Sequence, residues 1–398
     1  MAEIKNVSTE NIYRLDGRVP ILKAIPFGLQ HILAMFVSNL TPITIIGAAS
    51  GLDNAQIAIL LQNAMFIAGI ATLIQLYPLW RIGSRLPIVM GVSFTFVTIL
   101  SYVGSTYGYE TMVGAVLVGG FVEGTLGLLA KYWKKIITPV VAASVVTAIG
   151  YSLFTVGTRS FGGGYTPEFG SAQNLLLGSI TLVTCLVFNI LAKGYWKQLS
   201  VLAGLVVGYL CAMMMGVIDL SQIFSGGLFS LPHLFPYVPK FNIGAILSVT
   251  IIFMVSAAET IGDTTAMVSG GLNREIELRE ISGSLACDGY ASSLSALFGC
   301  PPVTSFSQNV GLINMTKVVN RGALSVGAIF LILCGLIPKL GAIVSIMPQS
   351  VLGGAAVMMF SSIVISGIQL ITKEEMTPRN LTIVSVALGV GYGMGANM

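Results

Sequence analysis

Apolar residues in this chain gather in long runs that are separated by short polar or Gly/Pro-rich segments. Hydrophobic residues make up 55% of the 398 positions and charged residues only 9%, whereas roughly a quarter of the residues in a soluble domain are charged. A helix needs about 20 mostly apolar residues to span a bilayer, and the runs approach or reach this length. The pattern therefore predicts an all-α polytopic membrane protein. The predicted spans are 25–48, 55–78, 86–101, 110–130, 136–157, 173–192, 199–217, 243–267, 282–298, 301–316, 323–338, 341–367 and 380–398.

Positive charges alternate regularly between the two sides that these spans define. Seventeen of the twenty Lys and Arg residues fall on the side of the N terminus, and only Arg159, Lys240 and Lys339 fall on the other side. The positive-inside rule then predicts a cytoplasmic N terminus for a protein of the cell membrane. Because these charges flank spans, the net charge of +4 gives no reason to expect a nucleic-acid partner. The residues on the predicted cytoplasmic side are Lys5, Arg14, Arg18, Lys23, Arg81, Arg85, Lys131, Lys134, Lys135, Lys193, Lys197, Arg274, Arg279, Lys317, Arg321, Lys373 and Arg379.

Two predicted spans, the third and the tenth, are poor continuous helices because Pro and Gly mix in them with β-branched and aromatic residues. Each is the third span of a seven-span unit, and Pro87 and Pro301 are 214 residues apart, as are Ser93 and Ser307. Seven is odd, so the second unit is predicted to insert upside down relative to the first. Interrupted spans at matching positions of an inverted repeat point to the binding site of a transporter. We expect a short extended stretch in each, with the two stretches pairing near the bilayer midplane.

Four carboxylates fall within predicted spans, and no Lys or Arg lies deep enough to pair with them. An ionised carboxylate at the centre of a membrane helix costs about 2.5–3.5 kcal/mol on insertion scales, so such a group needs a function or a proton. Glu259 and Asp263 are four residues apart and share one helical face, and Asp288 follows on the next span. These three are predicted to be functional, whereas Glu123 lies in a Gly-rich packing segment and is left out of the site. His31, the intramembrane histidine, is compatible with either a structural role or a polar network.

Residues 308–317, with the sequence QNVGLINMTK, place amides and a threonine within an apolar part of the chain. Lipid cannot solvate unpaired polar groups, so amides at membrane depth need partners or a function. The run resembles the signature of the nucleobase–ascorbate transporter family, which reads Gln/Glu-Asn-x-Gly, four free positions, Thr, then Lys/Arg/Gly. Further similarity lies at Gln30-His31, at residues 91–94 and at Ala258-Glu259, and the resemblance covers essentially the whole chain.

The resemblance implies fourteen spans in a seven-plus-seven inverted repeat. A core domain of spans 1–4 and 8–11 would hold the substrate, and a gate domain would provide the scaffold and the contacts of a homodimer. Because the sequence stops at the end of the thirteenth span, we expect the last span to be missing and the gate domain to come from spans 5–7 and 12–13. The expected organisation is a cytoplasmic tail at 1–22, a first repeat at 23–217, an inter-repeat loop at 218–241 and a truncated second repeat at 242–398.

The resemblance also implies roles for individual residues. Glu259 resembles the carboxylate that binds ring N–H groups of the base, and Gln308 resembles its second side-chain partner. Phe94 and Phe306 would flank the ring by aromatic packing, with backbone contacts around Ser307. The predicted substrate-binding residues are Glu259, Gln308, Phe94, Ser93, Ser307 and Phe306, and the predicted proton-coupling network is Asp288, His31, Asp263 and Asn309.

Members of this family import uracil, xanthine, urate or other purines with protons, and some animal relatives carry ascorbate with sodium. Xanthine and urate carriers typically have Gln at the position of Gln308, where uracil carriers have Glu. The sequence therefore predicts a secondary-active, proton-coupled purine permease for xanthine or urate, without a cofactor or a metal. A uracil permease of the same family and an anion carrier with the fourteen-span fold are the alternatives. A membrane enzyme is disfavoured because the sequence contains no recognisable metal cluster or nucleophile–base pair.

Overall fold

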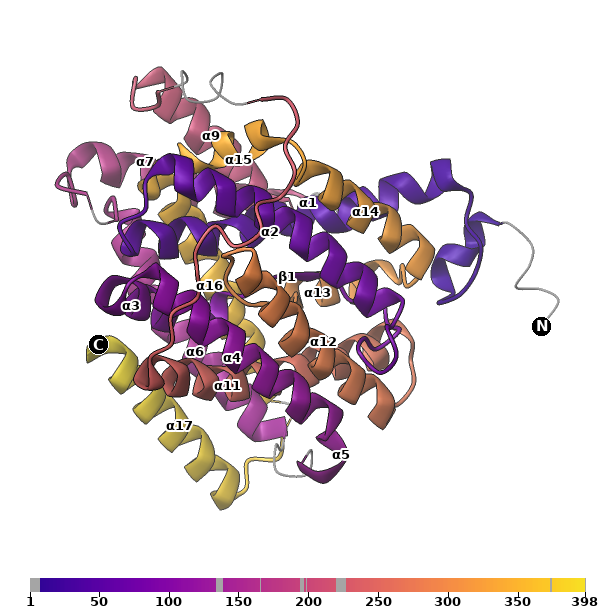
Figure 1. Ribbon diagram of the computed structural model, residues 1–398. Helices are drawn as coiled ribbons and strands as arrows, with labels where there is room; N and C mark the ends of the chain where they lie inside the picture. The colour runs from indigo at the N-terminus through magenta and orange to yellow at the C-terminus, as the bar shows by residue number, and fades with distance from the viewer. Residues whose placement is uncertain are drawn as a thin grey trace.

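The computed structural model describes residues 8–133, 139–164, 166–193, 197, 199–219, 227–372 and 374–397, and these form a mainly helical protein (Figure 1). Lys5, Lys134, Lys135, Lys373 and part of the predicted loop 218–241 lie outside the described residues. The first half contains η2 (Thr9–Tyr13), α1 (Ile21–Ala49), α2 (Asn54–Leu76), β1 (Met90–Val92), η3 (Phe94–Phe96), α3 (Val97–Tyr107), α4 (Tyr109–Leu128), α5 (Ala130–Trp133), α6 (Pro139–Phe161), α7 (Ala172–Leu191) and α9 (Ser200–Met214). The second half contains α11 (Ile243–Gly271), α12 (Leu278–Leu297), β2 (Val303–Ser305), α13 (Ser307–Thr316), α14 (Arg321–Cys334), α15 (Pro338–Ser345), α16 (Gln349–Ile371) and α17 (Pro378–Asn397).

Each of the thirteen predicted spans overlaps at least one of these helices. Six helices of the described part are long and apolar enough to cross a membrane alone, namely α1, α2, α4, α7, α11 and α16. A seventh candidate combines α14 with α15, which meet at a bend of 79°. The predicted span 341–367 is wrong in one respect, because it covers parts of two separate helices, α15 and α16. Pro348 explains the break, since a proline disfavours helical backbone at the residue before it and here caps the start of α16.

The packing of the helices follows the predicted inverted repeat. α4 packs against α12, and α2 packs against α14 at the equivalent place in the other half. In the same way, α11 packs against α4 as α1 packs against α14, and α17 packs against α6 as α7 packs against α16. Exchanging the two halves therefore leaves these contacts unchanged, as a seven-plus-seven inverted repeat requires.

The two broken spans meet in a two-stranded antiparallel sheet inside the helical body (Figure 1). The paired residues are Met90 with Ser305, Gly91 with Thr304, and Val92 with Val303. All six are buried. A side chain at Gly91 would place its Cβ within 3.0 Å of Met35, Phe306 and Asn39, so glycine allows this close approach. The structure confirms the prediction that both interrupted spans contain short extended stretches that pair.

Side chains of neighbouring helices satisfy backbone groups at the outer edges of this sheet. Oδ1 of Asn39 on α1 accepts a hydrogen bond from the Val92 N–H at 2.7 Å. Oγ1 of Thr72 on α2 accepts one from the Met90 N–H at 2.9 Å. Unpaired backbone groups are costly in an apolar medium, and these polar residues therefore allow so short a sheet to exist within a membrane protein.

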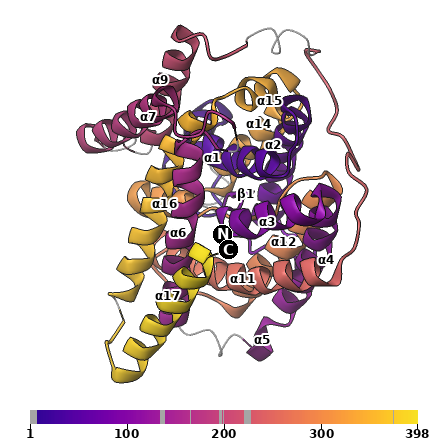
Figure 2. The same ribbon diagram turned by 90° about the vertical axis from the view of Figure 1, so that its left-hand side faces the viewer.

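Helices α6, α7, α9, α16 and α17 lie together along one side of the molecule, while the helices around the sheet form the other side (Figure 2). Among the contacts within the first group are those of α16 with α6 and with α7. The two broken spans and the helices that satisfy their strands all belong to the second group. The predicted gate domain contains the same five helices and, through the predicted span 341–367, also the end of α15, which packs against α2 of the second group. The division into a gate domain and a core domain stays a prediction.

Candidate functional site

Helix α11 carries two carboxyl groups toward the broken spans. Glu259 and Asp263 are both partly exposed and lie four residues apart on one face of the helix. Oε2 of Glu259 accepts a hydrogen bond of 2.6 Å from the hydroxyl of Thr95, which belongs to η3 at the start of the first broken helix. The hydroxyl of Ser307, the first residue of α13, lies 3.4 Å from Oε1 of Glu259. Glu259 thus contacts both broken spans.

Among the described residues, those that donate hydrogen bonds to the side chain of Asp263 belong to the second broken span. Its Oδ2 accepts from the hydroxyl of Ser307 at 2.8 Å and from the hydroxyl of Ser305 at 3.0 Å. A hydroxyl has a single proton to donate, so Ser307 can serve either Asp263 or Glu259 at one moment, but not both. At any moment, one of these two carboxyl groups therefore lacks the hydrogen bond from Ser307 and can bind a proton or accept a hydrogen bond from another donor.

Asp288 on α12 is completely buried next to this pair. Its Oδ2 accepts a hydrogen bond from the Thr260 hydroxyl on α11, and the backbone N–H of Ser305 approaches the same oxygen at 3.4 Å. The hydroxyl of Ser305 lies 3.5 Å from that of Thr260. Polar side chains consequently form an unbroken series, which we call the carboxyl–hydroxyl chain: Glu259, Ser307, Asp263, Ser305, Thr260 and Asp288.

Within the described ranges, no Lys or Arg pairs with these carboxyl groups. The ion pairs of the described residues instead involve Asp16, Glu110 and Glu280. Positive potential comes from the backbone, because α13 begins at Ser307, directly beside Glu259 and Asp263. The unsatisfied N–H groups at a helix N-terminus carry a partial positive charge. The site therefore combines carboxyl groups with helix-end N–H groups and no fixed cation.

The other predicted substrate-binding residues lie around the same place. Gln308 is the residue after Ser307, is partly exposed, and makes no side-chain hydrogen bond within the described part of the chain. Phe94 and Phe306 are buried at 7% and 6% exposure, on opposite broken spans. Phe94 packs edge-on against Phe360 of α16, with ring centroids 5.3 Å apart. The hydroxyl of Ser93 accepts a hydrogen bond from the Thr95 N–H at 3.3 Å, so it caps the short helix η3.

His31 and Asn309 form a separate contact. The Asn309 amide donates to the backbone oxygen of His31 at 3.0 Å and lies 3.2 Å from Nδ1 of its ring. Both side chains are buried at 1% exposure. Among the described residues, neither is hydrogen-bonded to Asp288, so this pair joins α1 to α13 without being part of the carboxyl–hydroxyl chain.

Three residues of the site were missed by sequence reasoning: Thr95, Thr260 and Ser305. The hydroxyls of Thr95 and Thr260 donate to carboxyl groups that are far away in the sequence, and the hydroxyl of Ser305 lies between Asp263 and Thr260. Their only sequence signal is their position next to residues that were singled out, since Thr95 follows Phe94 and Thr260 follows Glu259. Glu123, which was left out of the site, is buried at 1% exposure, and neither of its oxygens has a hydrogen-bond partner among the described residues.

Solved structures of membrane transporters have the same fold as this chain. The transmembrane domain of the cyanobacterial bicarbonate transporter BicA matches with a TM-score of 0.66 at 15% sequence identity, covering 94% of this chain and 96% of that chain. Murine Slc26a9, an anion transporter in an inward-facing state, matches with a TM-score of 0.64 at 11% identity, covering 94% and 67%. At such low identity these matches establish the fold alone.

The family is established by sequence. Residues 22–397 match the model of a permease family, and the chain belongs to that family, whose members are transporters and not enzymes. Xanthine permease XanQ of Escherichia coli strain K12 is 33% identical over 413 residues, which cover 99% of this chain and 88% of XanQ. Uric acid permease PucK of Bacillus subtilis strain 168 is 33% identical over 380 residues, which cover 94% and 87%. The resemblance to the nucleobase–ascorbate transporters is thereby confirmed.

Proposed function

We propose that this protein is a secondary-active permease that imports a purine nucleobase, xanthine or urate, together with protons. The observation that carries the proposal is the position of Glu259, which is partly exposed between both broken spans and lies 3.4 Å from the hydroxyl of Ser307, the residue before Gln308. A carboxylate accepts hydrogen bonds from ring N–H groups, and an amide offers one donor and one acceptor to a purine edge. The relatives named for xanthine and uric acid support the same substrate class.

Substrate choice is tested by competition. Cells that produce the protein are given labelled xanthine with an excess of unlabelled xanthine, urate, hypoxanthine or uracil. We expect xanthine or urate to compete and uracil to be at least about tenfold weaker, because one mismatched polar contact is worth 1.4 kcal/mol or more. Stronger competition by uracil than by both purines would favour the uracil permease instead.

The carboxyl–hydroxyl chain supports proton coupling. Each hydroxyl can accept a proton on one side and donate one on the other, so Ser307, Ser305 and Thr260 connect Glu259 with Asp288 through Asp263. Uptake driven by protons is expected to collapse with a protonophore and to be unaffected by replacing sodium with choline. The opposite result would favour sodium coupling.

The anion carrier is the alternative with some structural support, because the similar folds belong to bicarbonate and anion transporters. Three carboxyl groups that pair with no Lys or Arg of the described residues are an unfavourable environment for a small anion. Labelled bicarbonate and sulfate should therefore not be taken up above the background of cells with empty vector, whereas labelled xanthine or urate should be.

The proposal has three further parts: a cytoplasmic N terminus, a core domain around the two broken spans, and a homodimer formed through the gate helices. The distribution of basic residues supports the orientation. Cysteine labelling from either side of the membrane at Ser8→Cys, and cross-linking between subunits at exposed positions of α17, would test these two points.

A further inference from the structure

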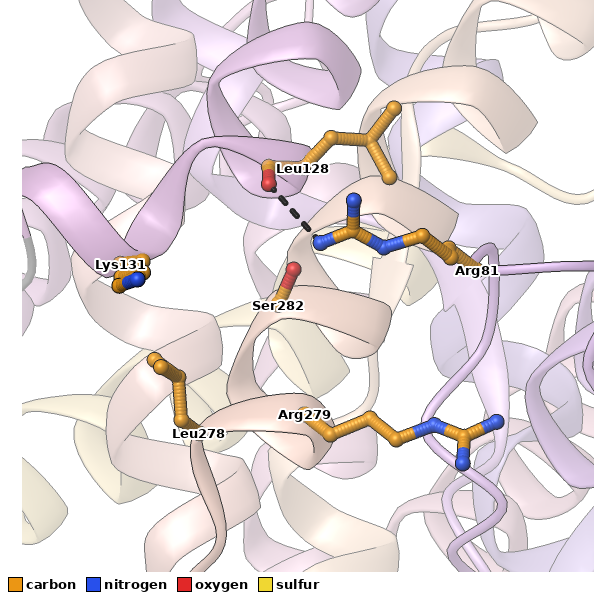
Figure 3. A pocket seen from close by; sticks show the side chains of 6 residues that line it. All are labelled: Arg81, Leu128, Lys131, Leu278, Arg279 and Ser282. Atoms are coloured by element: carbon orange, nitrogen blue, oxygen red, sulfur yellow. Dashed lines mark hydrogen bonds between the residues drawn. The ribbon is translucent and has the colours of Figure 1, made fainter.

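A pocket lies apart from the carboxyl–hydroxyl chain, where α4 ends and α12 begins (Figure 3). It has a volume of about 330 Å³. The residues that line it belong to the segment after α2, to α4 and α5, and to the first turns of α12. They are Arg81, Leu128, Lys131, Leu278, Arg279 and Ser282. None of them is part of the proposed substrate site.

Three of the lining residues are cations that pair with no acidic residue of the described ranges. In the described ranges, Arg81, Lys131 and Arg279 form no ion pair. One nitrogen of Arg81 donates to the backbone oxygen of Leu128 at 3.3 Å, which holds this guanidinium at the end of α4 (Figure 3). In the same view, Lys131 lies at the left, and the side chain of Arg279 runs from α12 toward the right, below Arg81 (Figure 3).

Other cations nearby, on the same predicted side of the membrane, form ion pairs with acidic residues. Arg85 and Arg321 both pair with Asp16. Arg274 pairs with Glu280, whose carboxylate also accepts from the Glu277 N–H at 2.9 Å. Glu280 is thus paired with Arg274 and not with Arg279, its neighbour in the sequence.

The surroundings of the pocket fit the boundary between lipid and water. Trp80 and Tyr132 are 74% and 79% exposed and directly adjoin Arg81 and Lys131 in the sequence. Exposed Trp and Tyr residues gather at the level of lipid headgroups. Leu128 and Leu278 add apolar wall to the pocket.

We propose that this pocket binds the phosphate headgroup of an acidic phospholipid in the leaflet that faces the N terminus. Guanidinium groups bind phosphate with two parallel hydrogen bonds, and Lys adds a point charge. Basic pockets between membrane helices on the cytoplasmic side suit such headgroups. The apolar wall and the exposed aromatic residues would contact the glycerol and upper acyl region, which free phosphate lacks. A bound lipid would connect α12 to the ends of α2 and α4.

Ligand titrations test the source of the phosphate. The purified full chain in detergent is titrated with short-chain phosphatidylglycerol, phosphatidylcholine or inorganic phosphate, and thermal unfolding is followed by tryptophan fluorescence. We expect phosphatidylglycerol to raise the unfolding temperature in a saturable manner and the other two to have no effect at the same concentration. An equal shift with inorganic phosphate would mean a free-anion site, and an equal shift with phosphatidylcholine would mean general lipid stabilisation. Either result overturns the proposal.

Substitutions of residues that line the pocket test whether the lipid binds there. Lys131→Gln/Arg279→Gln removes two cations that make no hydrogen bond within the described residues, and it should weaken the apparent phosphatidylglycerol affinity about 30-fold. Lys193→Gln/Arg379→Gln is the matched control, since it removes one Lys and one Arg from exposed positions on the same predicted side. Equal weakening in the control would reveal non-specific attraction and overturn the site.

A third variant covers the case in which the double substitution impairs folding. Arg279→Lys keeps the charge but loses the paired hydrogen bonds of the guanidinium. We expect it to fold and to bind phosphatidylglycerol with about tenfold lower affinity. Unchanged affinity in Arg279→Lys together with unchanged affinity in Lys131→Gln alone would contradict the proposal.

Discussion

The hydroxyl of Thr95 donates a hydrogen bond of 2.6 Å to Oε2 of Glu259, across 164 positions of sequence. This contact joins the first broken span, which belongs to one repeat, to the long helix α11, which belongs to the other. It fixes one oxygen of Glu259 and leaves the other oxygen near Ser307. The carboxylate is thereby oriented before any substrate arrives.

Thr95→Val is expected to raise the KM for purine uptake by roughly 10- to 100-fold, because a hydrogen bond to a charged group contributes about 1.5–3 kcal/mol. Val keeps the volume and removes only the donor. Thr95→Ser, which retains the hydroxyl, is the control and should stay close to the unaltered protein. Equal KM values for the Val and Ser variants would show that Thr95 does not orient Glu259.

Glu259→Gln is expected to reduce uptake by roughly 100-fold, because two charge-assisted hydrogen bonds to the base would become neutral ones of about half the strength. Uptake of labelled xanthine is measured in cells with matched amounts of protein in the membrane. Glu168→Gln makes the same change at an exposed residue after α6 and should transport normally. Normal transport by Glu259→Gln would remove this residue from the substrate site.

Gln308→Glu is expected to change selectivity more than rate. The substitution removes the donor N–H₂ and adds a carboxyl group, so a purine edge that needs the donor should lose about tenfold in affinity, while uracil gains relative to it. The measurement is a competition profile with uracil, xanthine, urate and hypoxanthine. An unchanged profile would place Gln308 outside the contact surface.

Asp288→Asn is expected to separate binding from coupling. The amide has nearly the same shape as the carboxyl group but cannot release a proton, so accumulation against a gradient should be lost while purine binding persists within about tenfold. Binding is measured by calorimetry on purified protein, and accumulation is measured in vesicles with an imposed pH gradient. If the variant still accumulates substrate, Asp288 is structural and the proton path ends at Asp263.

Gly289→Ala is expected to destabilise the protein by about 1–3 kcal/mol or more, as overpacking does in a close-packed interior. A Cβ at this position would lie 2.0 Å from the backbone nitrogen of Gly124 and 2.5 Å from the backbone oxygen of Gly120, both on α4. Gly389→Ala on α17, where no atom lies within 4 Å, is the control. Thermal unfolding in detergent should be lowered by the first substitution and unaffected by the second.

Local sequence signals predicted the broken spans but not all of the hydrogen bonds between them. Pro87 and Pro301, at matching positions of two seven-span units, were enough to place the paired strands, because proline and glycine disturb a helix wherever they occur. Glu259 and Asp288 were found because a carboxylate at membrane depth is costly by itself. In contrast, the role of Thr95 depends on a residue 164 positions away. A threonine in an apolar helix is too common to be singled out by its type.

The hydrophobic pattern also gave a wrong prediction where one predicted span corresponds to parts of two helices. The segment 341–367 is mostly apolar, and Pro348 marks the break between α15, which ends at Ser345, and α16, which begins at Gln349. The bend of 79° between α14 and α15 lies between Gly335, the C-cap of α14, and Pro338, the first residue of α15, and beyond it α15 packs against α2.

The three residue pairs of the β1–β2 sheet have a mechanical consequence. If Met90 moved away from Ser305, buried N–H and C=O groups of the sheet would lose their partners, which is costly in an apolar environment. Thr95 and Ser307 lie just beyond the two strands, so their spacing to Glu259 is kept by the same backbone bonds. A movement that exposes the site first to one side of the membrane and then to the other must therefore move both broken spans together as one rigid body. The deformation then has to occur where this rigid body borders α6 and α16.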